Sequence, residues 1–155
     1  MVRRNFAGLI LLSVALVAGC DSTKADVSKE RLKSMAGGEL KTVIPVSGTI
    51  LVDGTPTAGI NIYLHPEKGG PLIRQCRTDE KGAYCWATYV PCDGLEPGTY
   101  RLAFRLPTKQ EKKPGSGGDL FKGKYTNPMK LKADYTFTVK PNEPMTKVDY
   151  ELTTK

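Results

Sequence analysis

The chain has 155 residues and a formal net charge of +7, with 23 Lys and Arg against 16 Asp and Glu. This length suits one domain with its own hydrophobic core plus a short extension. Because His65 is the only histidine, the composition disfavours zinc sites and catalytic triads, which need an imidazole within reach of further specific groups. The basic balance is compatible with contact to anionic lipid head groups or acidic polymers, while a solvated lysine-rich loop that aids solubility is the simpler interpretation.

The N-terminal residues are arranged like a secretion signal. Arg3 and Arg4 provide a positive start, and residues 6–17 carry no charge. Small residues then precede Cys20 in the run Leu-Val-Ala-Gly-Cys, which resembles the lipobox of bacterial lipoproteins. The resemblance implies that residues 1–19 are cleaved off and that the Cys20 thiol receives a diacylglyceryl group. An ordinary cleaved signal is the alternative, whereas a transmembrane helix needs about 20 apolar residues and this stretch is shorter.

Composition divides the chain into three parts. Residues 1–19 are the predicted signal peptide, residues 20–44 are the lipidated cysteine with a flexible linker, and residues 45–155 are the predicted domain. The linker is polar and rich in Lys, Ser, Asp and Glu, so we expect a tether. A short helix over residues 26–35 is compatible with the same sequence.

From Val46 onward, apolar and polar residues alternate with a period of two, which predicts β-strands. Turn signals rich in Gly, Pro and Asp separate seven such segments, and no long helical period lies between them. We therefore predict an all-β fold, a seven-stranded antiparallel Greek-key β-sandwich. The side chains expected to face the core are those of Val46, Ile50, Val52, Ile60, Ile62, Leu64, Tyr84, Trp86, Tyr100, Leu102, Phe104, Tyr135, Phe137, Val139, Val148, Tyr150 and Leu152.

Three cysteines follow Cys20, and export would place them in an oxidising compartment where disulfides persist. A turn at residues 79–82 predicts a hairpin in which Cys76 faces Cys85, so this pair is the candidate disulfide. A bond between Cys85 and Cys92 is the main rival. Either choice leaves one thiol free or paired elsewhere. The spacing of the cysteines does not match that of zinc ligands.

Short motifs of turn and core residues occur in order along the domain. They are Val46-x-Gly48-x-Ile50, Asp53-Gly54-x-Pro56, Gly59-Ile60-x-Ile62, Thr78-Asp79-x-x-Gly82-x-Tyr84 and Pro97-Gly98-x-Tyr100. Together they resemble the carboxypeptidase regulatory-like domain, one of the transthyretin-like or prealbumin-like sandwiches. The later Lys124-Tyr125-x-Asn127-Pro128 is similar to small bacterial lipoproteins that carry this domain alone. The resemblance implies a noncatalytic module that accompanies enzymes or lies on cell surfaces.

The transthyretin-like group also includes a hydrolase that acts on hydroxyisourate, which is a remote alternative. By resemblance, that enzyme relies on several histidines, an arginine and a Tyr-Arg-Gly-Ser ending. This chain has His65 alone and ends in Glu-Leu-Thr-Thr-Lys. We therefore predict no catalytic residue, no metal ligand and no cofactor.

Residues 107–124 form the longest irregular stretch of the predicted domain, and long loops are often functional. We expect a partner contact here, in which lysines steer the partner and an exposed apolar pair anchors it. A mobile insertion is the alternative. The contact residues would be Lys109, Lys112, Lys113, Leu120, Phe121, Lys122 and Lys124.

These features predict an exported lipoprotein that is anchored to a membrane and forms a noncatalytic structural or binding module of the cell envelope. The domain would face the periplasm or the cell exterior. Its partners would be the membrane, through the lipid, and an envelope protein or polysaccharide, while the compartment argues against nucleic acid. The alternative function is binding of carbohydrate or an acidic polymer through residues 107–124.

Overall fold

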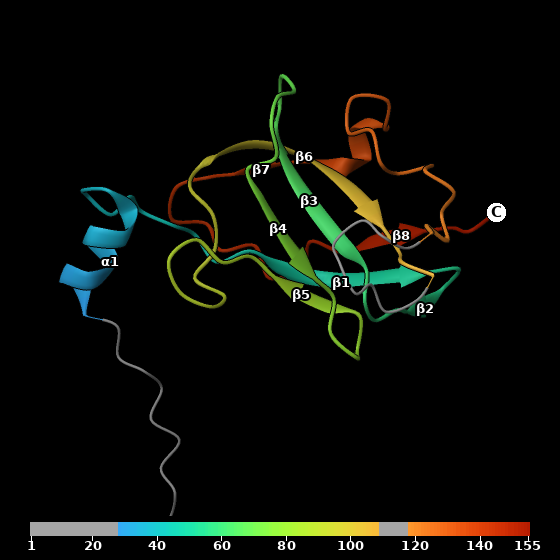
Figure 1. Cartoon of the computed structure of the whole chain (residues 1–155), viewed down its shortest axis with the longest axis horizontal. Coiled ribbons are helices and arrows are strands. Elements are labelled where there is room, and N and C mark those ends of the chain that lie inside the picture. The colour runs from blue at the N-terminus through green and yellow to red at the C-terminus, as the bar shows by residue number, and fades with distance from the viewer. Residues whose placement is uncertain (1–27, 109–117) are drawn as a thin grey trace, which may run out of the picture.

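The computed structural model describes residues 28–108 and 118–155, and it shows a mostly β protein with two sheets and one short helix (Figure 1). The prediction of an all-β sandwich is confirmed at this level. In chain order the elements are α1 (Lys29–Ala36), β1 (Ser47–Val52), β2 (Thr55–Pro56), β3 (Asn61–Pro66), β4 (Arg74–Arg77), β5 (Ala83–Cys85), β6 (Gly98–Arg105), the 3₁₀ turn η1 (Ala133–Tyr135), β7 (Thr136–Val139) and β8 (Tyr150–Leu152).

One sheet has the order β2-β1-β5, with β8 also paired to β1, and the other has the order β4-β3-β6-β7. The strand that the sequence did not predict is β2. Asp53 and Gly54 both have positive φ, 49° and 80°, and this two-residue turn folds Thr55–Pro56 back onto β1. The prediction of an antiparallel fold is wrong for β8, because β8 runs parallel to β1 after the chain has crossed over from β7 in the other sheet.

The predicted hairpin across residues 79–82 is also wrong, because β4 pairs with β3 and β5 pairs with β1. The turn itself is present, and the Gly82 N–H donates to the Asp79 carbonyl at 3.0 Å. Its role is to carry the chain from one sheet to the other. Buried Thr78 supports this crossing, since its hydroxyl donates to the Thr57 carbonyl at 2.8 Å and accepts the Ile60 N–H at 2.9 Å.

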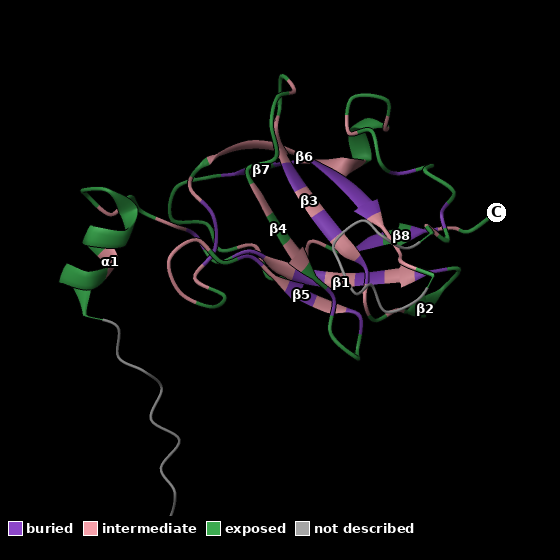
Figure 2. Ribbon diagram, viewed as in Figure 1, coloured by how far each residue is buried: buried purple, intermediate pink, exposed green. Residues whose placement is uncertain are grey.

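Alternation along the strands places the apolar side chains between the two sheets (Figure 2). Phe104 lies at the centre of this core, with its ring 5.5 Å from that of Tyr135 and 5.6 Å from that of Tyr150. Most of the side chains predicted to face the core are indeed buried. These are Val46, Ile50, Val52, Ile60, Ile62, Leu64, Tyr84, Trp86, Leu102, Phe104, Phe137, Val139, Tyr150 and Leu152.

Part of the predicted linker is ordered structure. Ser28 caps α1 by accepting the Arg31 N–H at 3.3 Å, and Gly37 ends the helix in a left-handed conformation. Ile44 is buried and pairs with Leu95, so the core begins within the predicted linker. Within residues 28–108 and 118–155, no helix has the length and apolar character needed to cross a membrane. In Figure 1, α1 and the C-terminus lie at opposite ends of the long axis.

Candidate functional site

The predicted contact segment at residues 107–124 is described only in part. Leu120 is 46% exposed, but Phe121 is only 2% exposed. The Phe121 ring packs edge-on against Tyr125, with 5.1 Å between centroids. The prediction of an exposed apolar pair is therefore wrong for Phe121, which belongs to the core. Three of the predicted contact residues lie outside the described residues, namely Lys109, Lys112 and Lys113.

The Asp119 carboxylate explains why Phe121 turns inward. Its Oδ1 accepts the N–H groups of Leu106 and Phe121, both at 3.1 Å, and its Oδ2 accepts the Gly123 N–H at 2.9 Å. A carboxylate that accepts several backbone N–H groups holds a turn in one shape. Asp119 thus has a structural role, and the turn that it organises buries the aromatic ring.

The two described lysines of the segment are both exposed. Lys122 occupies the turn with a positive φ of 52°. Lys124 donates from Nζ to the Lys155 carbonyl at 2.8 Å and lies 5.3 Å from the centroid of the Tyr125 ring. Lys124 is therefore committed in part to holding the C-terminal end of the chain.

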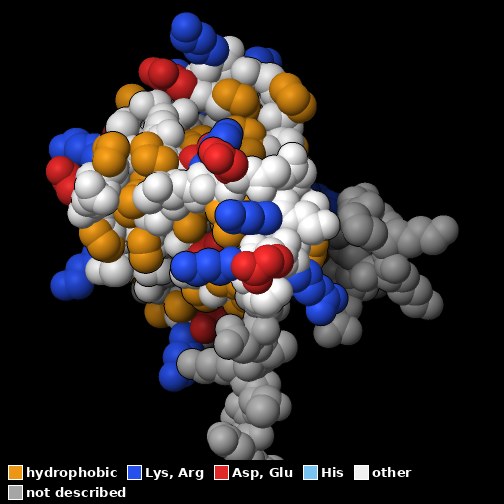
Figure 3. Space-filling view, turned by 90° about the vertical axis from the view of Figure 1, so that its left-hand side faces the viewer, with side chains coloured by type: hydrophobic (Ala, Val, Ile, Leu, Met, Phe, Trp, Pro, Cys, Tyr) orange, Lys and Arg blue, Asp and Glu red, His pale blue; other side chains and the backbone are white. Residues whose placement is uncertain are grey.

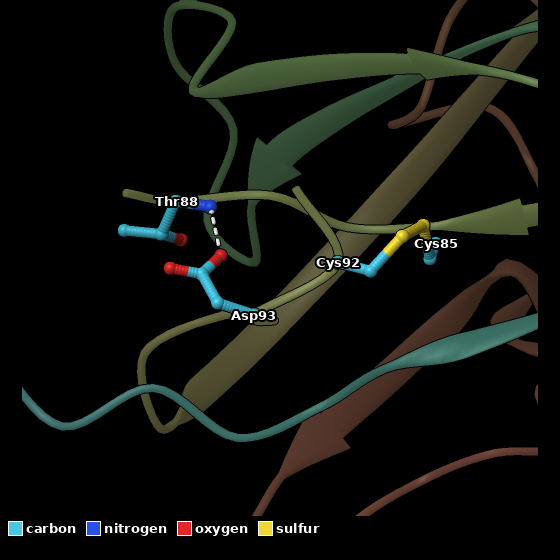
Figure 4. Close-up of a disulfide and its surroundings, with 4 residues drawn as sticks. All are labelled: Cys85, Thr88, Cys92 and Asp93. Atoms are coloured by element: carbon cyan, nitrogen blue, oxygen red, sulfur yellow. Dashed lines mark hydrogen bonds between the residues drawn. A yellow bond between two sulfur atoms is a disulfide. The ribbon is translucent and has the colours of Figure 1, made fainter. Parts of the chain in front are cut away.

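The structure joins Cys85 to Cys92, with 5.2 Å between their Cα atoms, and leaves Cys76 as a free thiol (Figure 4). The predicted pair of Cys76 with Cys85 is wrong because the two residues lie in different sheets. Cys76 stands opposite Ile62 on β3, whereas Cys85 stands opposite Ser47 on β1. The rival pairing that the sequence left open is the observed one.

The disulfide closes a connection between β5 and β6 that is also held by a carboxylate. Asp93 accepts the backbone N–H groups of Thr88, Tyr89 and Val90 at 2.6, 2.8 and 3.0 Å, the first of which Figure 4 shows. Charge-assisted bonds of this kind are stronger than bonds between neutral groups. The disulfide and the Asp93 carboxylate together stabilise one conformation of this loop.

A hollow of about 380 Å³ lies between α1 and this loop. Lys41 forms an ion pair with Glu96 at 2.9 Å, and its backbone N–H donates to the Tyr89 hydroxyl at 3.0 Å. The hydrogen bond and charge of Glu96 raise the pKa of Lys41. Basic and acidic side chains lie side by side at this end of the molecule (Figure 3). The lining is Leu32, Met35, Ala36, Glu39, Lys41, Arg74, Thr88, Tyr89 and Glu96.

A surface of one charge occurs elsewhere, on the outer side of the sheet β4-β3-β6-β7. Successive side chains of a strand point to opposite faces, and Ile62 and Leu102 point into the core. The register then places the alternate positions of all four strands on the outside. We call this set the outer arginine face. It consists of Asn61, Tyr63, His65, Gln75, Arg77, Thr99, Arg101, Ala103, Arg105, Thr136 and Thr138.

The outer arginine face contains three arginines and, at these strand positions, no Asp or Glu. All its members except Ala103 are at least partly exposed. Cross-strand pairing arranges nine of the residues in three rows. The rows are Arg77–Asn61–Arg105, Gln75–Tyr63–Ala103 and His65–Arg101–Thr136, the last without a β4 member.

Two of the arginines have defined surroundings. The Arg101 Nε donates to the Glu67 carbonyl at 2.8 Å, which orients the guanidinium plane. The Arg77 guanidinium lies beside Gly59, where an added Cβ would come within 3.0 Å of its Nη2. In the part of the chain that the structure describes, neither arginine forms a salt bridge with a carboxylate. Their positive charges are therefore available to an outside group.

Sequence reasoning missed this face, although part of its signal was present. Arg101 and Arg105 alternate with Leu102 and Phe104, so both were bound to point away from the core. The missing information was the pairing of β3 with both β4 and β6, which brings Arg77 onto the same surface. The pairing of β3 with β6 joins segments far apart in the chain and leaves no local pattern, whereas β3 and β4 are consecutive strands.

The groups with strongly shifted pKa values belong to the core. Burial raises the pKa of the Cys76 thiol to about 12. Burial also raises the pKa of Tyr84, whose hydroxyl donates to the Val148 carbonyl at 2.7 Å.

His65 has its Nδ1 3.3 Å from the Gly70 carbonyl oxygen. Among the described residues, no cluster of His, Cys, Asp and Glu could hold a metal ion.

Comparisons with known proteins identify no relative of this chain. No protein-family model matches the chain, and no curated protein matches it either. The resemblance to the carboxypeptidase regulatory-like domain therefore stays a prediction, as does the absence of a catalytic role.

Proposed function

We propose that the protein is an exported lipoprotein, anchored to a membrane through lipid on Cys20, whose sandwich serves as a noncatalytic binding module of the cell envelope. The fold proposed for this module is the Greek-key, transthyretin-like sandwich of the carboxypeptidase regulatory-like domain. Cys20 lies outside the described residues, so the anchor is supported by the sequence alone.

The observation that carries export is the disulfide between Cys85 and Cys92. Disulfides persist in oxidising compartments such as the periplasm and the cell exterior, and they are rare where thiols are kept reduced. The lipobox-like run before Cys20 independently predicts the same destination. Two or more acyl chains on one cysteine are sufficient for stable membrane attachment.

A binding role is favoured over catalysis by where the ionisable groups lie. The groups with the largest pKa shifts, Cys76, Tyr84 and Tyr150, are buried or packed against the core. The arginines of the outer arginine face, in contrast, are at least partly exposed on the surface of a sheet. An open surface of one charge suits recognition of a partner rather than the enclosure of a reacting group.

Mass spectrometry of the mature N-terminus tests the anchor. The full chain would be expressed in a bacterium with lipoprotein processing and then fractionated, beside the variant Cys20→Ala and the control Cys76→Ala. We expect the wild-type N-terminal peptide to begin at Cys20 with acyl chains attached and to come from the membrane fraction. The variant Cys20→Ala should lack the lipid, while Cys76→Ala should retain it. A mature chain that begins at another residue without lipid would refute the anchor.

A further inference from the structure

We infer that the outer arginine face is a binding site for an acidic polysaccharide, whose carboxylate groups pair with Arg77 and Arg101. This inference deepens the proposed function, and it rests on that proposal only for the view that the sandwich is a binding module. It does not depend on the lipid at Cys20, and it assigns the contact to the sheet surface rather than to the segment at residues 107–124.

The guanidinium groups of the outer arginine face are complementary in charge to the carboxylates of an acidic polysaccharide. Guanidinium groups are planar forks that pair with carboxylates through two parallel hydrogen bonds. Arg77 is exposed, and its described surroundings contain no salt-bridged carboxylate. Arg101 uses Nε for the Glu67 carbonyl, and this bond holds its guanidinium plane in one orientation for a ligand. Held orientation lowers the entropy that is lost when a ligand binds.

The two arginines lie far apart on the sheet. Arg77 on β4 and Arg101 on β6 are separated by β3, and they stand opposite Asn61 and His65, four positions apart along that strand. Their Cα atoms are therefore about 16 Å apart. Positive charges spread in this way cannot converge on one small anion. They match a chain molecule that carries carboxylates at intervals.

Side chains that form hydrogen bonds lie between the arginines. Asn61, Tyr63, His65 and Gln75 occupy the same face. Their amide, phenol and imidazole groups can donate and accept hydrogen bonds, which suits the hydroxyl groups of sugars. The Tyr63 ring also provides a flat surface with a polar tip.

The composition of the face argues against a membrane or a protein partner. Membrane-surface binding and protein interfaces both use exposed apolar anchors. None of the strand positions of the face is a Leu, Ile, Val, Met or Phe. Of the exposed large apolar side chains in the described residues, Ile73 directly precedes β4 at the edge of the face, and Met35, Leu72, Leu120 and Met129 lie outside its strands. An extended, hydrated polyanion is the ligand class that a polar and cationic sheet surface fits best.

Calorimetric titration of the purified full chain with alginate, a polymer of uronic acids, tests the inference. Neutral dextran and vesicles of phosphatidylglycerol serve as comparison ligands. We expect alginate to bind in a salt-sensitive manner and dextran not to bind. The double variant R77Q/R101Q should weaken alginate binding by about tenfold or more, because it removes two charge-assisted contacts with carboxylates. The control K140Q/K147Q removes the same charge elsewhere and should stay within about twofold of wild type.

Further variants decide the outcome if R77Q/R101Q is poorly folded. The variant R77K/R101K keeps the charge and removes the fork, so it should bind alginate with intermediate strength. Equal weakening by K140Q/K147Q, or loss of binding only in K122Q/K124Q, would overturn the inference, as would preferred binding to the anionic vesicles. The lipid analysis of Cys20 is a separate readout, so failure of the anchor and failure of this site are distinguishable.

Discussion

The outer faces of the two sheets differ in how their charges are used. On the sheet that contains β1, the acidic side chain of Asp149 accepts the Thr49 backbone N–H at 2.7 Å, so its charge is committed to holding strands together. On the outer arginine face, Arg77 and Arg101 have no described carboxylate partner. Asp149 uses its charge to hold the fold, whereas Arg77 and Arg101 have no carboxylate partner among the described residues, although Arg101 Nε donates to a backbone carbonyl. The comparison teaches that a charge without an opposite charge beside it is available for recognition.

Both faces depend on the same layer of apolar side chains between the sheets. Inside the sandwich, alternation is imposed by packing, because a shift of one residue would expose the apolar set. On the outer faces, packing places few limits on the type of side chain, so the two faces can differ in charge and polarity. Substitutions in the core should therefore affect both faces, whereas substitutions on one outer face should affect that face alone.

The largest effect is expected where one strand contributes to both the core and the outer arginine face. Phe104→Ala should lower the free energy of unfolding by about 3–5 kcal/mol, because it leaves a cavity among the packed rings. Arg101→Gln, three residues away on the opposite face, should change it by about 0.5 kcal/mol. Urea unfolding measures both values, and similar losses in the two variants would contradict the inward and outward assignment.

The second-largest loss of stability is expected when the disulfide between Cys85 and Cys92 is removed. The double variant C85A/C92A should be less stable by about 2–3 kcal/mol, since the bond closes a short loop with a sequence separation of 7. A reducing agent should destabilise the wild type by a similar amount and leave the double variant unchanged.

Peptide mapping of the alkylated protein checks which cysteines are bonded. Cys76 should react with iodoacetamide slowly at pH 8 until the protein unfolds, because burial disfavours the thiolate and raises its pKa to about 12. Recovery of a crosslinked peptide that joins Cys76 to Cys85 would contradict the structure.

Local patterns were enough to predict the core but not the connections. A period of two in the sequence was sufficient to predict that Ile60, Ile62 and Leu64 face the core, and all three are buried. The cysteine pairing required knowing whether the turn after Cys76 closes a hairpin or crosses between sheets, and the local sequence of the turn suits both. Phe121 shows no period at all, because the Asp119 carboxylate rather than a strand turns it inward.

Long-range pairing limited the prediction in the same way at the candidate site. The parallel pairing of β8 with β1 joins residues about a hundred positions apart, as in Ile50 with Tyr150. The outer arginine face likewise depends on β3 lying between β4 and β6. The outward direction of Arg101 could be read from its own strand, but its neighbours could not. The segment at residues 107–124 is rich in lysine, and for that reason the sequence predicts the contact there and not on the sheet.

A smaller effect should distinguish the two faces directly. Asp149→Ala removes a charged acceptor and leaves the Thr49 N–H without its partner, so it should cost about 1–2 kcal/mol of stability. Arg77→Gln should cost about 0.5 kcal/mol or less, because its charge has no described partner to lose. Thermal unfolding of the two variants beside wild type provides the measurement. A larger loss in Arg77→Gln would show that the arginine serves the fold, and it would remove the contrast between the faces.

The smallest effect concerns Asp53, another acidic group that is committed to structure. Its carboxylate accepts hydrogen bonds from the hydroxyls of Thr154 and Thr153, at 2.5 and 2.7 Å, and these bonds lower its pKa. Because the folded state then favours the charged form, its contribution is complete above the ordinary carboxyl pKa of about 3.9 and is lost as the pH falls through the lower folded value.

The variant Asp53→Asn isolates this contribution, since asparagine tolerates the positive φ of the turn and cannot ionise. We expect the wild type to lose more thermal stability than Asp53→Asn between pH 5 and pH 3, and the two curves to run in parallel above that range. Carboxyl NMR should show Asp53 titrating below the ordinary value. An ordinary titration would mean that the threonine hydroxyls do not hold the charge, and that acidic groups near the C-terminus are no more committed to the fold than the arginines of the opposite sheet.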